Sequence, residues 1–140
     1  MNELDHQVEL FRWARLHAPQ YPALQLLFAI PNGGLRNAVV ARKLKAAGVE
    51  RGVPDICLPV ARNPYHGFWI ELKRPEKSHV TAAQHQWIDR LNAEGYRAEI
   101  CTGWVEAVNR LVEYLDLPLL LRPYSRPVIL LHPPKQGEKK

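Results

Sequence analysis

Two carboxylates and an ammonium group stand where two apolar stretches of the sequence begin or end. Asp55 opens the run DICLPV, Glu71 lies near the end of the run GFWIEL, and Lys73 follows two positions later. Like charges held together at the ends of buried strands raise a pKa or recruit a cation. Because carboxylate oxygens alone suit a hard metal ion, these residue types indicate Mg²⁺ or Mn²⁺ rather than zinc.

The two apolar runs flank the segment ARNPYHG, whose Asn, Pro and Gly are typical of a loop, so they predict a β-hairpin. With residues 61–66 as the loop, Asp55 lies opposite Glu71 or Leu72. Because side chains alternate along a strand, Glu71 and Lys73 project from the same face. A surface salt-bridge cluster is the commoner explanation of a Glu-x-Lys sequence. The position at the end of strands that should be buried favours a functional site.

The elements that must position these side chains follow from hydrophobic periodicity and from capping residues. Apolar residues at helical spacing predict a helix over 3–17, and the apolar run 24–30, stopped by PNGG, predicts a buried strand. Asn37 and Thr81 can each cap a helix. The expected order is α-β-α-β-β-α-β-α, with helices over 3–17, 37–47, 81–92 and 104–115 and strands over 24–30, 55–60, 67–72 and 96–102.

Length and composition indicate one compact domain, because 140 residues that are 46% hydrophobic can bury a core. We expect this domain to cover residues 1–117, and the proline-rich residues 118–140 to form an extended arm. Cys57 and Cys101 lie inside apolar runs without the spacing of a disulfide framework, so we expect buried thiols. No stretch is long and apolar enough for a membrane span, and the N-terminus does not resemble a signal peptide. We therefore expect a cytoplasmic protein.

The net charge of +5 is unevenly spread along the chain. The segment between positions 35 and 51 contains one acidic residue and five basic residues, which are Arg36, Arg42, Lys43, Lys45 and Arg51. One interpretation is a solvated helix face, and the other is a surface that binds a phosphate backbone. The preceding PNGG is either a plain turn or a loop that faces DNA.

An ordered set of motifs then resembles a known family. GVPD, FWIELKRP and VTAAQHQWIDRLNAEGY resemble the VRR-NUC (virus-type replication-repair nuclease) family of the PD-(D/E)xK nucleases. The resemblance covers about Glu3 to Leu115 and includes IPNGGLRN and KLKAAGVERGVPD. It implies a restriction-endonuclease-like α/β core with a central mixed β-sheet flanked by helices.

The resemblance also implies roles for individual residues. Asp55 and Glu71 bind a divalent metal, Lys73 assists the attacking water, and Gln84 matches a glutamine on the following helix. On the first helix, Glu3 matches the family glutamate, which the resemblance makes a further catalytic residue and metal ligand, and Gln7 matches the family glutamine. At this spacing the two side chains share a face. Glu9 is the alternative acid, although an exposed position near Arg12 explains it equally well.

We therefore expect a Mg²⁺-dependent endonuclease, with Mn²⁺ also supporting activity, that hydrolyses phosphodiester bonds. Its substrate would be branched DNA, above all four-way junctions, cut by a homodimer. The residues expected to contact DNA are Asn32, Arg36, Arg42, Lys43, Lys45 and Arg51. The alternative is a non-catalytic DNA-binding or assembly module that keeps the nuclease fold. The grouped like charges favour the enzyme, because a binding module has no reason to hold them together.

Overall fold

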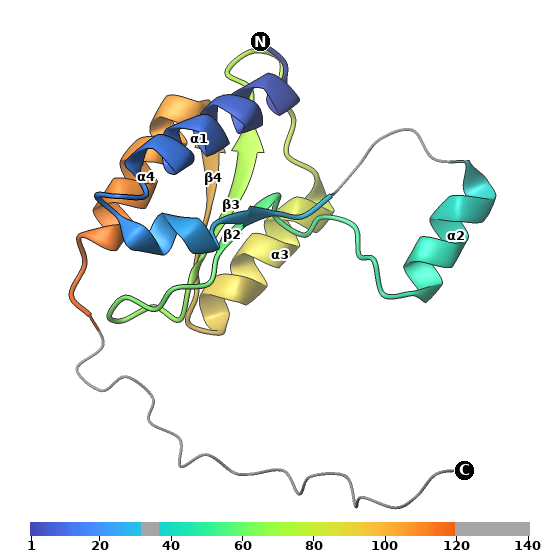
Figure 1. Cartoon of the computed structure of the whole chain (residues 1–140). Coiled ribbons are helices and arrows are strands. Elements are labelled where there is room, and N and C mark those ends of the chain that lie inside the picture. The colour runs from blue at the N-terminus through green and yellow to red at the C-terminus, as the bar shows by residue number, and fades with distance from the viewer. Residues whose placement is uncertain (32–36, 120–140) are drawn as a thin grey trace, which may run out of the picture.

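The computed structural model describes residues 1–31 and 37–119 of the chain. Over these residues it confirms an α/β fold in which helices flank a mixed β-sheet (Figure 1). The elements in chain order are α1 (Glu3–His17), the 3₁₀ helix η1 (Pro22–Leu26), β1 (Phe28–Ala29), α2 (Ala38–Ala46), β2 (Ile56–Leu58), β3 (Phe68–Lys73), α3 (Ala82–Ala93), β4 (Arg97–Thr102) and α4 (Trp104–Leu115). No helix within the described ranges is long and apolar enough to cross a membrane.

The sheet has the strand order β1-β2-β3-β4. Strand β2 pairs antiparallel with both β1 and β3, which confirms the predicted hairpin, and β4 is parallel to β3. A parallel pair needs a crossover connection, and α3 supplies it. The hairpin register places Ile56 opposite Ile70, and one step further outward it places Asp55 opposite Glu71. This is one of the two registers that the sequence allowed.

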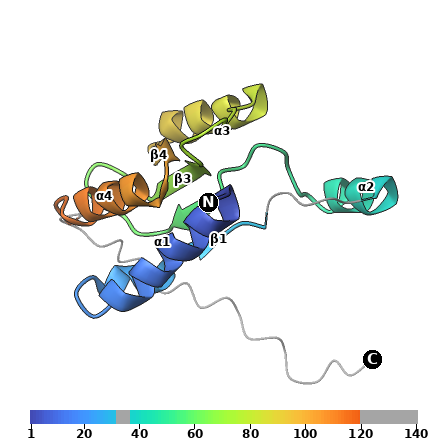
Figure 2. The same ribbon diagram turned by 90° about the horizontal axis from the view of Figure 1, so that it is seen from above.

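Helices cover both faces of the sheet. Seen from above, α3 lies on one side of β3 and β4, while α1 lies on the other side together with α4 (Figure 2). The core on the α4 side contains Phe68, Ile70 and Leu72, which alternate along β3, and Tyr114 stacks on Phe68 with ring centroids 5.0 Å apart. Because successive strand residues point to opposite faces, Glu71 and Lys73 point away from this core. They face the side on which α3 lies.

The expected strand over 24–30 is wrong for most of its length. Residues Pro22–Leu26 form the 3₁₀ helix η1, and only Phe28–Ala29 remain as strand β1. Leu24 and Leu27 are buried whereas Leu26 and Phe28 are exposed, so burial repeats every three residues, as in a 3₁₀ turn. Pro22 favours this start because its fixed φ suits the first position of a helix. Because nearly every residue of this short run is apolar, the sequence does not show whether burial follows the period of a helix or that of a strand.

Helix α2 stands apart from the other elements in both views (Figures 1 and 2). Asn37 caps it as predicted, by accepting a hydrogen bond from Val40 N at 2.8 Å, and Gly48 follows its end with a positive φ. None of its residues is buried. Its anchor lies at the base, where Ile30 N donates a hydrogen bond to Asp55 O at 2.7 Å. The chain between Ile30 and Asp55 therefore leaves the sheet and returns to it at adjacent points.

Candidate active site

Asp55 and Glu71 come together at the end of the β2–β3 hairpin. Asp55 directly precedes β2, and its Oδ2 accepts a hydrogen bond from Leu72 N at 3.1 Å, which fixes its carboxylate against β3. The Glu71 side chain is only 2% exposed. The loop before Asp55 is closely packed as well, because Pro54 is fully buried and a Cβ added at Gly52 would lie 2.6 Å from the backbone of Ala83 in α3. The motif GVPD is thus a packing motif as well as a chemical one.

Burial and mutual repulsion shift the titration of this pair. Burial, and then the charge of Asp55, raise the pKa of Glu71, whereas the Lys73 ammonium acts in the opposite direction. Burial raises the pKa of Asp55 too, and the hydrogen bond from Leu72 partly offsets it. Two neighbouring carboxylates withdrawn from water resist carrying two negative charges. With its pKa raised to about 8, Glu71 keeps its proton near neutral pH in the metal-free protein.

Lys73 lies between two acids from different elements. Its Nζ is 3.7 Å from Glu71 Oε1 and 3.7 Å from Glu3 Oε1, and its side chain is 9% exposed. The backbone of Lys73 is fixed as well, because its carbonyl accepts a hydrogen bond from Gly103 N at 2.7 Å. An ammonium group held at this position is a donor that can orient a water molecule or a phosphate oxygen.

Glu3 reaches this site from the first turn of α1. It shares a helix face with His6, Leu10 and Ala14, the buried residues of α1, because the spacing of three and four residues repeats once per turn. Sequence reasoning missed His6, whose Nδ1 accepts a hydrogen bond from Trp104 N at 3.1 Å and so joins α1 to the start of α4. An apolar helix face interrupted by one histidine was the available signal.

The alternative acid on α1 is engaged elsewhere. Glu9 accepts a hydrogen bond from Arg12 Nη1 at 2.7 Å within the same helix. Of the two candidates, Glu3 is the one that lies beside Lys73. Gln7, which was matched to the family glutamine, is half-buried on α1.

Gln84 joins α3 to the carboxylate pair. Thr81 and Gln84 form a capping box, in which Gln84 N donates to Thr81 Oγ1 and Thr81 N donates to Gln84 Oε1. With its oxygen committed to the cap, the amide directs its nitrogen outward, and Nε2 donates to Glu71 Oε1 at 2.7 Å. The Thr-x-x-Gln spacing is typical of a capping box, so the sequence could have indicated that the cap fixes the Gln84 side chain.

The main indication of a metal site is one oxygen of the Glu71 carboxylate. Glu71 Oε2 is buried, and no donor in the described part of the chain hydrogen-bonds to it. A buried carboxylate oxygen without a donor is costly unless a proton or a cation takes that place. The donor set around it consists of oxygens, which fits Mg²⁺ or Mn²⁺. Asp55 and Glu71 are the residues that would hold the ion.

A third protein ligand is not in place within residues 1–31 and 37–119. No group of three or more His, Cys, Asp or Glu side chains there converges on a common metal position. The carboxylate of Glu3 instead lies against Lys73. Its assignment as a metal ligand stays a prediction.

The basic residues assigned to DNA lie away from the carboxylate pair. Arg42, Lys43 and Lys45 are exposed on α2, and Arg51 is exposed in the loop that leads back to the sheet. No carboxylate in the described chain forms an ion pair with any of them. Asn32 and Arg36 lie outside the described residues. The site therefore has an acidic centre and, across the connection to α2, a basic surface.

A mixed sheet with helices on both faces, and two acids and a lysine at the end of its central hairpin, are the arrangement expected of the PD-(D/E)xK class. The family model of the VRR-NUC domain matches residues 3–104, and the chain belongs to this family. A solved structure described as a VRR_NUC domain protein matches with a TM-score of 0.73 and 28% sequence identity, over 85% of this chain and 92% of that one. No curated protein matches the chain. Family membership indicates a nuclease-type function that processes DNA.

Proposed function

We propose that the protein is a metal-dependent DNA endonuclease that hydrolyses phosphodiester bonds with Mg²⁺, or alternatively Mn²⁺. The observation that carries the proposal is the pairing of half-buried Asp55 with buried Glu71, in which Glu71 Oε2 lacks a hydrogen-bond donor within the described chain. A fold gains nothing from such a pair, because like charges withdrawn from water destabilise it. The arrangement makes sense where a divalent cation neutralises both.

The protein side chains around the pair have separable tasks. A bound metal ion would polarise the phosphoryl oxygen and lower the pKa of a water ligand. Gln84 donates a hydrogen bond to Glu71 Oε1, so Oε2 is the oxygen that would be available to hold the ion. Lys73, fixed through its carbonyl and flanked by Glu3 and Glu71, orients the attacking water and offsets the negative charge that develops on the phosphate.

We further propose that α2 and Arg51 bind the DNA backbone. The helix carries three exposed cations on a short element with no buried residue, so its side chains are available to phosphates. Arg51 stands four residues before Asp55 on a loop that is packed against α3. Backbone contacts of this kind would position the duplex over the carboxylates without reading its sequence.

The proposed substrate is branched DNA, above all four-way junctions, and the proposed assembly is a homodimer. Resolving a junction takes two symmetry-related cuts, and a two-fold dimer presents two sites in that relation. The outer edge of β4 is partly occupied, because side chains of this chain bond the backbone of Ala98 and Thr102. The Asn92 side chain bonds both N and O of Ala98, and Glu106 accepts from Thr102 N at 2.7 Å. We therefore place the dimer contact on other elements.

Cleavage of a labelled four-way junction and of linear duplex, with Mg²⁺ or with EDTA, tests the proposal. Wild-type protein should nick opposed strands of the junction in Mg²⁺ only. Asp55→Ala and Glu71→Ala should remove cleavage and keep DNA binding. Glu76→Ala is the matched control, since this glutamate is exposed and makes no ion pair in the described chain. Binding without cleavage under all metal conditions would instead support a non-catalytic module, and light scattering at the mass of one chain would refute the dimer.

A further inference from the structure

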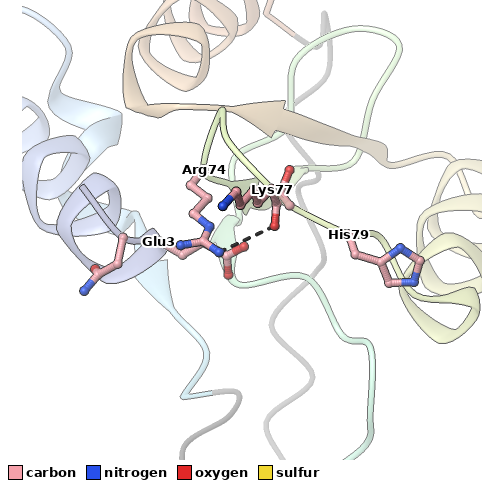
Figure 3. A pocket seen from close by; sticks show the side chains of 6 residues that line it. Glu3, Arg74, Lys77 and His79 are labelled. Carbon is pink, nitrogen blue, oxygen red and sulfur yellow. Dashed lines mark hydrogen bonds between the residues drawn. The ribbon is translucent and has the colours of Figure 1, made fainter.

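A hollow next to Glu3 is otherwise lined by residues that have no role in the site described above. It has a volume of about 320 Å³ and is lined by Asn2, Glu3, Arg74, Lys77, Ser78 and His79. These residues come from the start of α1 and from the loop that joins β3 to α3. Figure 3 shows Arg74 and Lys77 between Glu3 on one side and His79 on the other. The lining contains no apolar side chain.

The two cations of the hollow are not neutralised by the described part of the protein. Arg74 and Lys77 form no ion pair with any carboxylate there, and neighbouring Glu76 pairs with neither. The only acid in the lining, Glu3, already lies 3.7 Å from Lys73 Nζ. Guanidinium, ammonium, hydroxyl and amide groups together are donors that suit a phosphate. The cations of the hollow, unpaired within the described chain, therefore suit an anionic ligand.

The loop backbone is shaped to keep these cations in place. Lys77 adopts a φ of 50°, the only positive φ of a non-glycine residue in the described chain. Its carbonyl accepts a hydrogen bond from Arg74 Nη2 at 3.5 Å, drawn as the dashed line in Figure 3. A side chain other than glycine in this region is strained, and such strain is concentrated at functional sites. Arg74 and Lys77 thus contact one another and line the same hollow.

The hollow also adjoins the proposed reaction centre. Arg74 directly follows Lys73 in the chain, and Glu3 borders both the hollow and Lys73. A DNA strand whose phosphate lies at the carboxylate pair would bring its next phosphate to this loop. We propose that Arg74 and Lys77 bind an internal phosphodiester of the cleaved strand, adjacent to the one that is hydrolysed. The inference rests on the proposed nuclease function and assigns that site a contact on its substrate.

The test combines a double variant with DNA that lacks single charges. Arg74→Ala/Lys77→Ala is compared with Arg15→Ala/Arg90→Ala, which removes the same charge from exposed positions near the far ends of α1 and α3. The substrate is a labelled DNA that the wild type cleaves, made as a series with one uncharged methylphosphonate at successive positions around the cut. The double variant should lose about 10-fold or more in kcat/KM, because two charge-assisted contacts are removed. The control should cleave like the wild type, and Arg74→Lys/Lys77→Arg should restore most of the activity.

One methylphosphonate position should slow the wild type by a similar factor and should not slow the double variant further, since both changes remove the same contact. Equal cleavage by the two double variants, or effects that multiply at every position, would overturn the inference. Binding of the same DNA series in EDTA, followed by fluorescence anisotropy, separates the two proposals. If the wild type binds the DNA but never cuts it, the proposed nuclease function is refuted. The phosphate contact is still supported if one methylphosphonate position weakens binding by proteins that keep Arg74 and Lys77 and does not weaken binding by the double variant.

Discussion

Replacing Glu71 by glutamine should stabilise the metal-free protein at alkaline pH while it destroys the proposed site. Burial and the Asp55 charge raise the pKa of Glu71 from 4.5 to about 8. Between these values the folded protein keeps a proton that the unfolded chain has released, so the free energy of unfolding falls as the pH rises through this window. Below pH 4.5 and above pH 8 this contribution is constant. Because the glutamine side chain cannot ionise, the free energy of unfolding of the variant should not fall in this way as the pH rises.

The size of the effect follows from the same shift. One unit of pKa corresponds to about 1.4 kcal/mol, so the shift sets a ceiling of about 5 kcal/mol. In the variant, Lys73 loses its acidic neighbour Glu71, whose Oε1 lies 3.7 Å from Lys73 Nζ. This loss reduces the stabilisation that the variant gains. We expect Glu71→Gln to unfold with about 2–4 kcal/mol more free energy than the wild type at pH 9, and with little difference at pH 5. For a chain of this size that corresponds to a rise in Tm of roughly 5–15 °C.

Thermal unfolding in EDTA from pH 5 to pH 9 measures the difference. Glu76→Gln provides the control, because its exposed carboxylate should give no pH-dependent change in stability relative to the wild type. Millimolar Mg²⁺ at pH 8 should raise the Tm of the wild type and of Glu76→Gln but leave Glu71→Gln unchanged, since binding to the native state stabilises it. A stability difference between Glu71→Gln and wild type that is the same at both ends of the pH range would refute the reasoning.

Three further outcomes are expected. Lys73→Ala should lower kcat by about 100-fold or more with DNA affinity nearly kept, which single-turnover cleavage measures. Neutralising the three basic residues of α2 together should weaken DNA binding and reduce the slope of log affinity against log salt by about two to three, and an unchanged slope would return α2 to a solvated helix face. Gly52→Ala should lower stability by about 2 kcal/mol or more and lower the Tm, because its Cβ would lie 2.6 Å from the Ala83 backbone. Gly48→Ala is the matched control, since it also has a positive φ but meets nothing within 4 Å in the described chain.

The sequence predicted the centre of the site better than its surroundings. The meeting of Asp55, Glu71 and Lys73 depends on strand alternation and on the length of one hairpin loop, and both can be read from local residues. The helices were also predictable, because Asn37 and Thr81 cap them as expected. These features depend on contacts between residues that are near in sequence.

What the sequence did not reveal depends on contacts over long separations. His6 lies nearly the whole domain away from Trp104 in sequence, and no local pattern announces their hydrogen bond. The 3₁₀ helix in place of a strand is a similar case, since the burial of Leu24 and Leu27 is decided by the core they join. The placement of Glu3 against Lys73 follows from how α1 packs across the sheet, which periodicity alone does not determine.

The closed base of the α2 excursion gives the molecule a modular build. Because Ile30 N bonds Asp55 O, the sheet is closed at the base of the excursion, so helix α2 can differ in length and sequence without altering the sheet, provided that Gly52 and Pro54 keep their packing. The same closure has a mechanical side. The excursion ends at Asp55 itself, and residues 47–54 connect it to the end of α2, with Gly52 and Pro54 packed in place. In the proposed nuclease, a load placed on α2 by a bent or branched substrate would therefore reach the carboxylate pair through this one segment.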